Sequence, residues 1–208
     1  MRRTIVRNYN RASKGAGMIK KMLIVISTML FAFVVTAQDI MVKPGDIALW
    51  MPKDIYQVIA SIRCPQLPFW YHADVVIDEE GRISTATPEN GCSSFSTIQN
   101  RIDSGSWQKL LLLRNNSLTE EQIENILTIA IETECEYDWI GFYLQWLDFL
   151  FFCDDILVFR VLPDDYTNYN CLSFAAFCEG FSHPHSITPW GIIATPGWET
   201  VGEYNLEE

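Results

Sequence analysis

Basic residues are scarce in most of this 208-residue chain. Seven of the 15 Lys and Arg residues lie in residues 1–37, so residues 38–208 carry eight basic against 26 acidic side chains, a net charge of −18. A body this acidic repels nucleic acids and anionic lipid surfaces. We therefore expect no nucleic-acid partner.

Several catalytic and cofactor motifs are also absent. The chain contains no GxGxxG, P-loop or HExxH motif, and it has only three histidines, His72, His183 and His185. His183 and His185 could be grouped with Cys178 as metal ligands, but their spacing fits no common zinc pattern. We expect neither a cofactor nor a bound metal ion.

Residues 1–37 contain no acidic side chain. Their basic residues precede an apolar run from Met22 to Val35, which ends in small residues at Ala37. This order is typical of a secretory signal peptide, and the run is shorter than the roughly 20 apolar residues of a membrane span. We predict that residues 1–37 are removed. The mature domain, 38–208, would then be periplasmic or secreted, with no stable membrane span.

Strand patterns dominate the first half of that domain. Four segments have alternating or continuous apolar residues of strand length: 44–50, 69–78, 82–87 and 107–114. The short turn at 79–81 predicts that the second and third of these pair as a hairpin. The continuous apolar run of the fourth predicts a central, buried strand.

Helical patterns follow. They are a short helix near 53–62, an amphipathic helix at about 119–135 behind a Ser117–Glu120 capping box, an aromatic stretch at 139–152 and a short helix at 171–180. The aromatic stretch is either a buried helix or an apolar wall beside the active site. A strand at 155–162 and a tail of loop with short extended pieces complete the pattern. The sequence therefore predicts one α+β domain, an antiparallel sheet with helices packed against it.

Cys171 is the cysteine best placed for chemistry. It opens the helix at 171–180, with Asn168 or Asn170 available as the N-cap. The first turn of a helix presents free N–H groups and the positive end of the helix dipole, which lower the pKa of a thiol and can hold an oxyanion. The alternative is a buried structural cysteine.

His72 is the candidate base, within the strand segment 69–78. Gly45-Asp46, then His72 with a returning strand, then Asn170-Cys171 opening a late helix together resemble the YiiX-like group. Its members are circularly permuted proteins of the NlpC superfamily of papain-like cysteine hydrolases. The resemblance covers about 44–180 and implies a papain-like fold with Cys171 as nucleophile and His72 as general base.

Three positions depart from the group's pattern. Asp74 stands where the group has glycine after its histidine, and Leu172-Ser173 replaces Ser-Glu after the nucleophile. Thr85 stands where the group has a glutamate that orients the histidine. A threonine hydroxyl can accept a hydrogen bond but cannot stabilise an imidazolium by charge. The resemblance therefore implies Thr85 as third residue and a low activity.

The function that this resemblance implies is hydrolysis of an amide bond in a cell-wall peptide, another peptide or a lipid amide. One alternative is a weak or inactive pseudoenzyme that serves as a binding module. Another is a lipid acyltransferase of the same fold. Six cysteines are present, Cys64, Cys92, Cys135, Cys153, Cys171 and Cys178. With Cys171 free, they permit at most two disulfides, whose pairing the sequence leaves open.

Overall fold

The computed structural model describes residues 40–53, 70–151 and 167–206. The predicted signal peptide, the helix near 53–62 and the strand at 155–162 lie wholly or mainly outside these residues. The described residues all belong to one compact unit of the chain.

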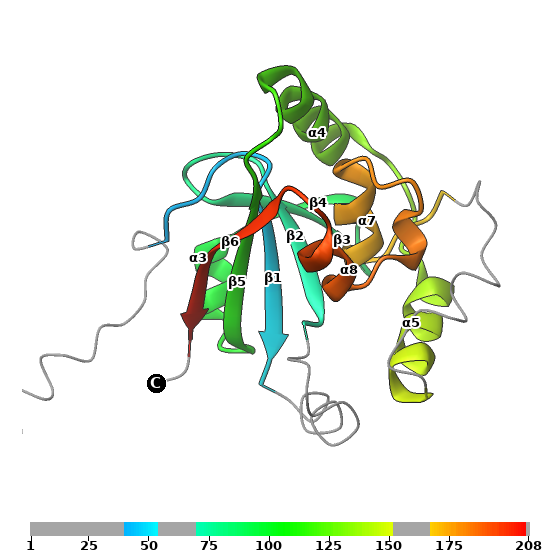
Figure 1. Ribbon diagram of the computed structural model, residues 1–208. Coiled ribbons are helices and arrows are strands. Elements are labelled where there is room, and N and C mark those ends of the chain that lie inside the picture. Colours follow the sequence, from blue (N-terminus) through cyan, green and yellow to red (C-terminus); the bar gives the residue numbers. More distant parts are fainter. Residues whose placement is uncertain (1–39, 54–69, 152–166, 207–208) are drawn as a thin grey trace, which may run out of the picture. The chain divides into compact units, whose positions relative to one another are not determined.

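A six-stranded sheet forms the centre of this unit (Figure 1). Its strands are β1 (Ile47–Pro52), β2 (His72–Val76), β3 (Arg82–Thr87), β4 (Gly91–Thr97), β5 (Trp107–Asn115) and β6 (Trp198–Asn205). They lie in the order β4-β3-β2-β1-β5-β6, and every neighbouring pair is antiparallel. The predicted antiparallel sheet and the central place of β5 are confirmed.

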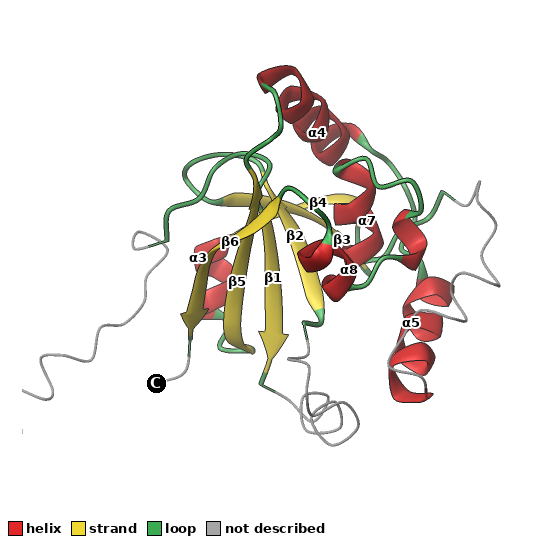
Figure 2. Cartoon of the chain, viewed as in Figure 1, coloured by secondary structure: helices red, strands yellow, loops and turns green. Residues whose placement is uncertain are grey.

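Five α-helices accompany the sheet in the described residues (Figure 2). They are α3 (Ile98–Asp103), α4 (Glu120–Glu132), α5 (Trp139–Phe151), α7 (Cys171–Cys178) and α8 (Pro189–Ala194), with a short 3-10 turn, η2 (Pro184–Ser186), before α8. The fold class is therefore α+β, as the sequence predicts.

The two faces of the sheet bury different cores. On one face, strand residues that include Trp50, Val76 and Ile83 pack with Ile98 of α3. On the other face, a set that includes Ala73 and Val75 packs with residues of α4, α7 and α8. Because side chains alternate along a strand, His72 and Asp74 share the face of Val76, whereas Ala73 turns toward α7. β2 pairs with β3 only at Val75 and Val76, so the edge of β2 at His72 is not covered by β3 and is open to the start of α7. Strand β2 thus presents polar groups to one layer and apolar groups to the other.

The start of α4 differs from the prediction. Its N-cap is Thr119, whose hydroxyl accepts from Gln122 N and whose own N–H donates to the Gln122 side chain. Ser117 instead donates to the Asn115 side chain at 2.6 Å. Both Ser117–Glu120 and Thr119–Gln122 fit the capping-box spacing, and the helix begins two residues later because Ser117 belongs to the preceding turn.

The interpretation of 139–152 as a wholly buried helix is wrong for one side of α5. Trp139, Ile140, Tyr143 and Leu147 are exposed. The last segment of the chain is also more ordered than expected, because it forms α8 and then β6, which pairs with β5 along its length.

One disulfide joins Cys92 at the start of β4 to Cys135 after α4. Their Cα atoms are 5.1 Å apart, and the bridge closes a separation of 43 residues. Cys171 and Cys178 are free thiols, whereas Cys64 and Cys153 lie outside the described residues. In the part of the chain that is described, no helix is long and apolar enough to cross a membrane.

Candidate active site around Cys171 and His72

Asn170 fixes the start of α7. Its side-chain oxygen accepts from Leu172 N at 3.1 Å and Ser173 N at 3.0 Å, while Ser173 Oγ accepts from Asn170 N at 2.9 Å. Asn170, of the two predicted candidates, is therefore the N-cap. Its amide accounts for two N–H groups of the first turn, and the N–H of Cys171 has no acceptor among the described residues.

The structure brings the Cys171 thiol close enough to the imidazole of His72 for each group to shift the pKa of the other. The N–H of Ala73, the next residue of β2, also acts on the thiol and favours its charged form. Burial alone would raise the pKa of Cys171, but His72 and this N–H outweigh burial and lower the pKa below its ordinary value. The side chain is 6% exposed. The structure therefore places the predicted nucleophile, Cys171, and the predicted base, His72, near each other.

Asp74 holds the other side of the imidazole. Its Oδ1 lies 2.7 Å from His72 Nε2, and its side chain is wholly buried. Burial would raise the pKa of this carboxyl, yet His72 and then Arg101 lower it to about 2. Asp74 is therefore ionised at neutral pH. With Nε2 directed at Asp74, Nδ1 is the imidazole nitrogen left for the thiol.

Arg101 of α3 completes this group. Its Nε donates to Asp74 Oδ2 at 3.2 Å, and its Nη2 donates to Asp74 Oδ1 at 3.0 Å. The same Nη2 lies 2.8 Å from His72 Nε2. When Nε2 carries a proton for Asp74, it cannot also accept from Arg101, so this last contact sets two donors against each other. Arg101 fixes Asp74 while opposing the charge on the ring.

The imidazole is nevertheless held in its protonated form. Burial lowers the pKa of His72, but Asp74 and the Cys171 thiolate together raise it to about 9. The lowered pKa of Cys171 and the raised pKa of His72 both favour a thiolate–imidazolium pair over the neutral thiol and imidazole. This pair is the reactive state of a cysteine nucleophile.

The expectation that Thr85 orients His72 requires correction. Thr85 is buried, and its hydroxyl donates to the backbone oxygen of Ala73 at 2.9 Å. The carboxylate beside the ring comes from Asp74, two residues along the same strand, because such residues share a face. Thr85 holds the β2 backbone instead.

Sequence reasoning treated Asp74 as a departure, with the orienting role only as an alternative to Thr85, and missed Arg101. The spacing of His72 and Asp74 within a strand was the available signal, since it places both side chains on one face. Arg101 had no such signal. It lies in a six-residue helix, and its approach to Asp74 depends on how α3 packs on the sheet.

Two tyrosines lie beside the Cys–His pair. Burial, and after it the charge of Cys171, raises the pKa of Tyr137, so this phenol stays protonated near the thiol. Tyr71 directly precedes His72. It makes edge contacts with Phe142 and Trp146 of α5, at centroid distances of 6.0 and 6.3 Å.

The other histidines lie elsewhere. His185 stacks on Tyr169 with ring centroids 4.9 Å apart, and its Nδ1 is 3.9 Å from Asp138 Oδ2. His183 precedes η2. Within the described ranges, no group of three His, Cys, Asp or Glu side chains has the arrangement of a metal site.

Comparison with known proteins gives little beyond the geometry. No protein-family model matches this chain, and no curated protein matches it. Among solved structures, the chain is similar to the metalloprotein YiiX from Escherichia coli O157:H7, with 11% identity and a TM-score of 0.42. That match covers 78% of this chain and 97% of YiiX. A likeness this distant carries no argument about function.

Proposed function

We propose that this protein is an exported cysteine hydrolase of the papain-like, permuted NlpC type, acting on amide bonds. The observation that carries the proposal is the position of one buried imidazole between a thiol and a carboxylate. His72 and Cys171 shift each other's pKa, and His72 Nε2 is 2.7 Å from Asp74 Oδ1. Nucleophile, base and orienting group are the three parts that acyl transfer by a side chain needs.

The first half-reaction forms a thioester. The Cys171 sulfur, its proton already on His72, attacks the carbonyl carbon, and the C=O electron pair moves to oxygen. The N–H of Cys171, which has no acceptor in the described residues, donates to this oxyanion. The intermediate then expels the nitrogen, which takes the proton from His72 and leaves as an amine.

The second half-reaction restores the enzyme. His72, now neutral, takes a proton from water, and the hydroxide attacks the thioester carbonyl. The C–S bond breaks, the acid departs, and the proton on His72 again balances the thiolate. Asp74 contacts His72 throughout, so it stabilises each imidazolium state and keeps Nδ1 directed at the reacting groups.

The case for a pseudoenzyme depended on Thr85 and Asp74 as departures from the group's pattern, and the contact of the Asp74 carboxylate with His72 weakens it. An acyltransferase would use the same thioester and differ only in its acceptor. Incubating the protein with an N-acyl amide and measuring the free acid against an acyl ester or a new amide separates these two reactions.

Thiol labelling tests the nucleophile itself. At pH 7, limited iodoacetamide treatment followed by mass-spectrometric mapping should modify Cys171 well before Cys178. Cys171→Ala should abolish amide turnover, and His72→Gln should slow labelling of Cys171. If folded Cys171 reacts no faster than the same residue in denatured protein, with access confirmed, it is not an activated nucleophile.

Export is the second part of this proposal. It is supported by the basic and apolar character of residues 1–37 and by the Cys92–Cys135 disulfide, which suits an oxidising compartment. N-terminal sequencing of the natively produced protein should find a mature chain that begins near Gln38. A mature form that retains 18–37 would contradict it.

A further inference from the structure

The ring of Trp107 lies next to the imidazole of His72. The two ring centroids are 5.6 Å apart and the ring planes are inclined by 30°, so the rings meet more nearly face to face than edge to face. Trp107 is the first residue of β5, and His72 is the first residue of β2. The indole is therefore a further neighbour of the candidate base, besides the thiol, the carboxylate and the guanidinium described above.

An irregularity in the sheet brings Trp107 to this face. Leu111 of β5 packs in the core around α7, and strict alternation along the strand would place residue 107 on the same side. The pairing of β5 with β1 shifts register between Lys109 and Trp107, however, and Trp107 packs in the core that contains Trp50. A bulge of this kind redirects a side chain. Here it turns the indole to the face of His72.

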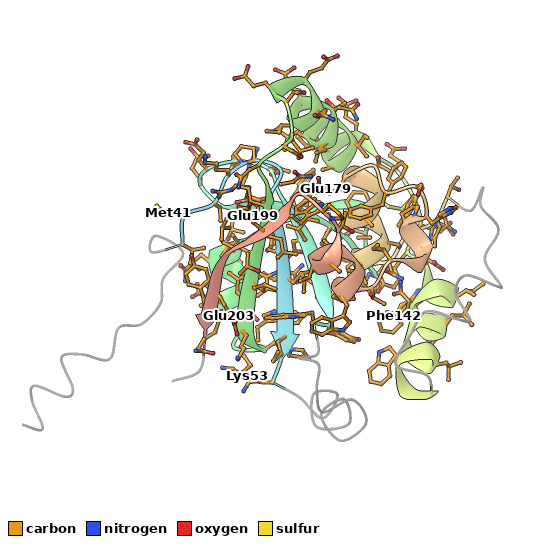
Figure 3. The ribbon with its side chains drawn as sticks, viewed as in Figure 1. Met41, Lys53, Phe142, Glu179, Glu199 and Glu203 are labelled. Carbon is orange, nitrogen blue, oxygen red and sulfur yellow. A yellow bond between two sulfur atoms is a disulfide. The ribbon has the colours of Figure 1, made fainter. Side chains whose placement is uncertain are left out.

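Two further contacts hold the indole in place. Trp50 is fully buried, pairs with His72 across β1 and β2, and lies 5.9 Å from Trp107 between ring centroids. Lys53 follows β1, and its N–H donates to the backbone oxygen of Ser106 at 3.0 Å, which ties the end of β1 to the residue before Trp107 (Figure 3, where Lys53 is labelled). The position of the indole is thus set by the backbone and by a buried ring.

The charges around His72 give this indole a role. Arg101 Nη2 lies 2.8 Å from His72 Nε2 and opposes a positive charge on the imidazole, whereas Asp74 favours it. The face of an indole carries the negative part of its quadrupole and attracts a cation within about 6 Å of the ring centroid. Loss of water works in the other direction, since it disfavours the charged form. The stacked geometry favours the attraction, because it directs the negative face and not the positive edge at the imidazolium.

We propose that Trp107 is a positioning residue whose indole face stabilises the His72 imidazolium and holds it against Asp74. The inference rests on the proposed function for the reaction that the imidazolium serves, and on the ring geometry for the contact itself. Through this contact Trp107 offsets part of the repulsion from Arg101, so the buried imidazole keeps the proton that the leaving amine later takes. Trp107 acts through His72 and not on the substrate.

NMR titration of the histidines tests the inference without requiring turnover. The full chain has three histidines, so with isotope-labelled histidine the His72 signal is the one that His72→Gln removes. Its pKa should be about 9 in the wild type. In Trp107→Leu, which keeps an apolar side chain without a π face, the pKa of His72 should fall by about one unit, and in Trp107→Phe it should fall by less. The ring current of the indole also displaces the His72 proton signals, so its loss reports removal of the contact.

Trp198→Leu is the matched control. Trp198 is a partly buried tryptophan of β6 that packs in the core on the other face of the sheet. Its substitution should leave the pKa of His72 unchanged, so a change seen only at Trp107 is not a general effect of losing an indole. Circular dichroism shows that each variant is folded. In Trp107→Leu, the alkaline decline of amide turnover should also move to lower pH.

The outcomes separate the inference from the proposed function. An unchanged pKa of His72 in folded Trp107→Leu, or an equal fall in Trp198→Leu, would overturn the inference even if amides are hydrolysed. A raised pKa would overturn it too, because the indole would then act on His72 mainly by excluding water. If Trp107→Leu does not fold, the same results in Trp107→Phe decide. A lowered pKa in a protein without amide turnover would support the stacked imidazolium and contradict the hydrolase.

Discussion

Cys171 and Cys178 stand at the two ends of the same helix and differ in almost everything that governs a thiol except burial. Both are buried in the core around α7. Burial alone raises the pKa of each, but His72 and an N–H lower that of Cys171, whereas the Glu179 charge adds to burial at Cys178. The first turn of α7 therefore holds the proposed nucleophile, and its last turn holds a thiol whose pKa is raised.

This contrast shows that burial does not decide the reactivity of a cysteine. The reactivity depends on the sign of the charge next to the sulfur and on the end of the helix at which the cysteine lies. The ratio of the Cys171 to the Cys178 alkylation rate measures the difference directly. Substitutions around His72 should change this ratio in a definite order.

Asp74→Asn should have the largest effect, because it removes the charge that raises the pKa of His72 to about 9. The protonated ring is favoured below that pKa and lost above it, so a lower pKa reduces the thiolate–imidazolium pair at pH 7. Each pKa unit that His72 loses changes the equilibrium between the charged pair and the neutral pair tenfold. We expect the ratio of the Cys171 to the Cys178 alkylation rate to fall on the order of 10- to 100-fold. The Cys171 alkylation rate against pH measures it.

Amide hydrolysis gives a second measure of the same substitution. Wild-type turnover should decline above about pH 9, where His72 loses the proton that the leaving amine needs. In Asp74→Asn this decline should move to lower pH. Superimposable pH profiles in a folded variant would mean that Asp74 does not set the charge of the ring.

Arg101→Gln should have a smaller effect in the opposite direction. Its guanidinium lies 2.8 Å from His72 Nε2, so its removal relieves a repulsion. The decline in turnover should move to higher pH by about one unit, since a neighbouring charge shifts a pKa by about that amount or more. Arg101→Lys keeps the positive charge but loses the two guanidinium hydrogen bonds to Asp74. It therefore separates the effect of the charge on His72 from the positioning of Asp74. A downward move in Arg101→Gln would mean that its support of Asp74 dominates.

Thr85→Val should have the smallest effect on the ratio. It removes the hydrogen bond to the Ala73 oxygen and should reduce the free energy of unfolding by about 1 kcal/mol, measured in urea. The pH profile of Cys171 should not move. Thr85→Glu, the change expected to raise activity if Thr85 faced the ring, would bury an unpaired carboxylate and should destabilise the fold. A moved profile in Thr85→Val would restore Thr85 as the orienting residue.

Local patterns account for the parts of the fold that the sequence predicts. β3 has the predicted bounds, 82–87. The Asn170 cap fixes the start of α7 within a few residues of sequence. Strand alternation, a turn residue and a cap all act over short range, so they can be identified without knowing the neighbours.

The parts of the fold and of the candidate site that the sequence does not predict depend on contacts between distant segments. β6 alternates but exposes most of its side chains, and it becomes a strand because β5 offers a free edge. The role of Thr85 depended on which groups of β2 and β3 meet, and Arg101 reaches Asp74 across 27 residues of sequence. Such positions follow from packing, which a residue pattern does not specify.

The spacing of the two thiols on α7 has a further consequence under oxidising conditions. Seven residues of helix separate Cys171 from Cys178 by about 10 Å, and a disulfide requires Cα atoms within about 7 Å. Surroundings oxidising enough to join Cys92 to Cys135 therefore cannot lock these two thiols together while α7 stays folded. The folded helix keeps the two thiols apart, so the Cys92–Cys135 bridge and a reduced Cys171, the proposed nucleophile, can coexist in one domain.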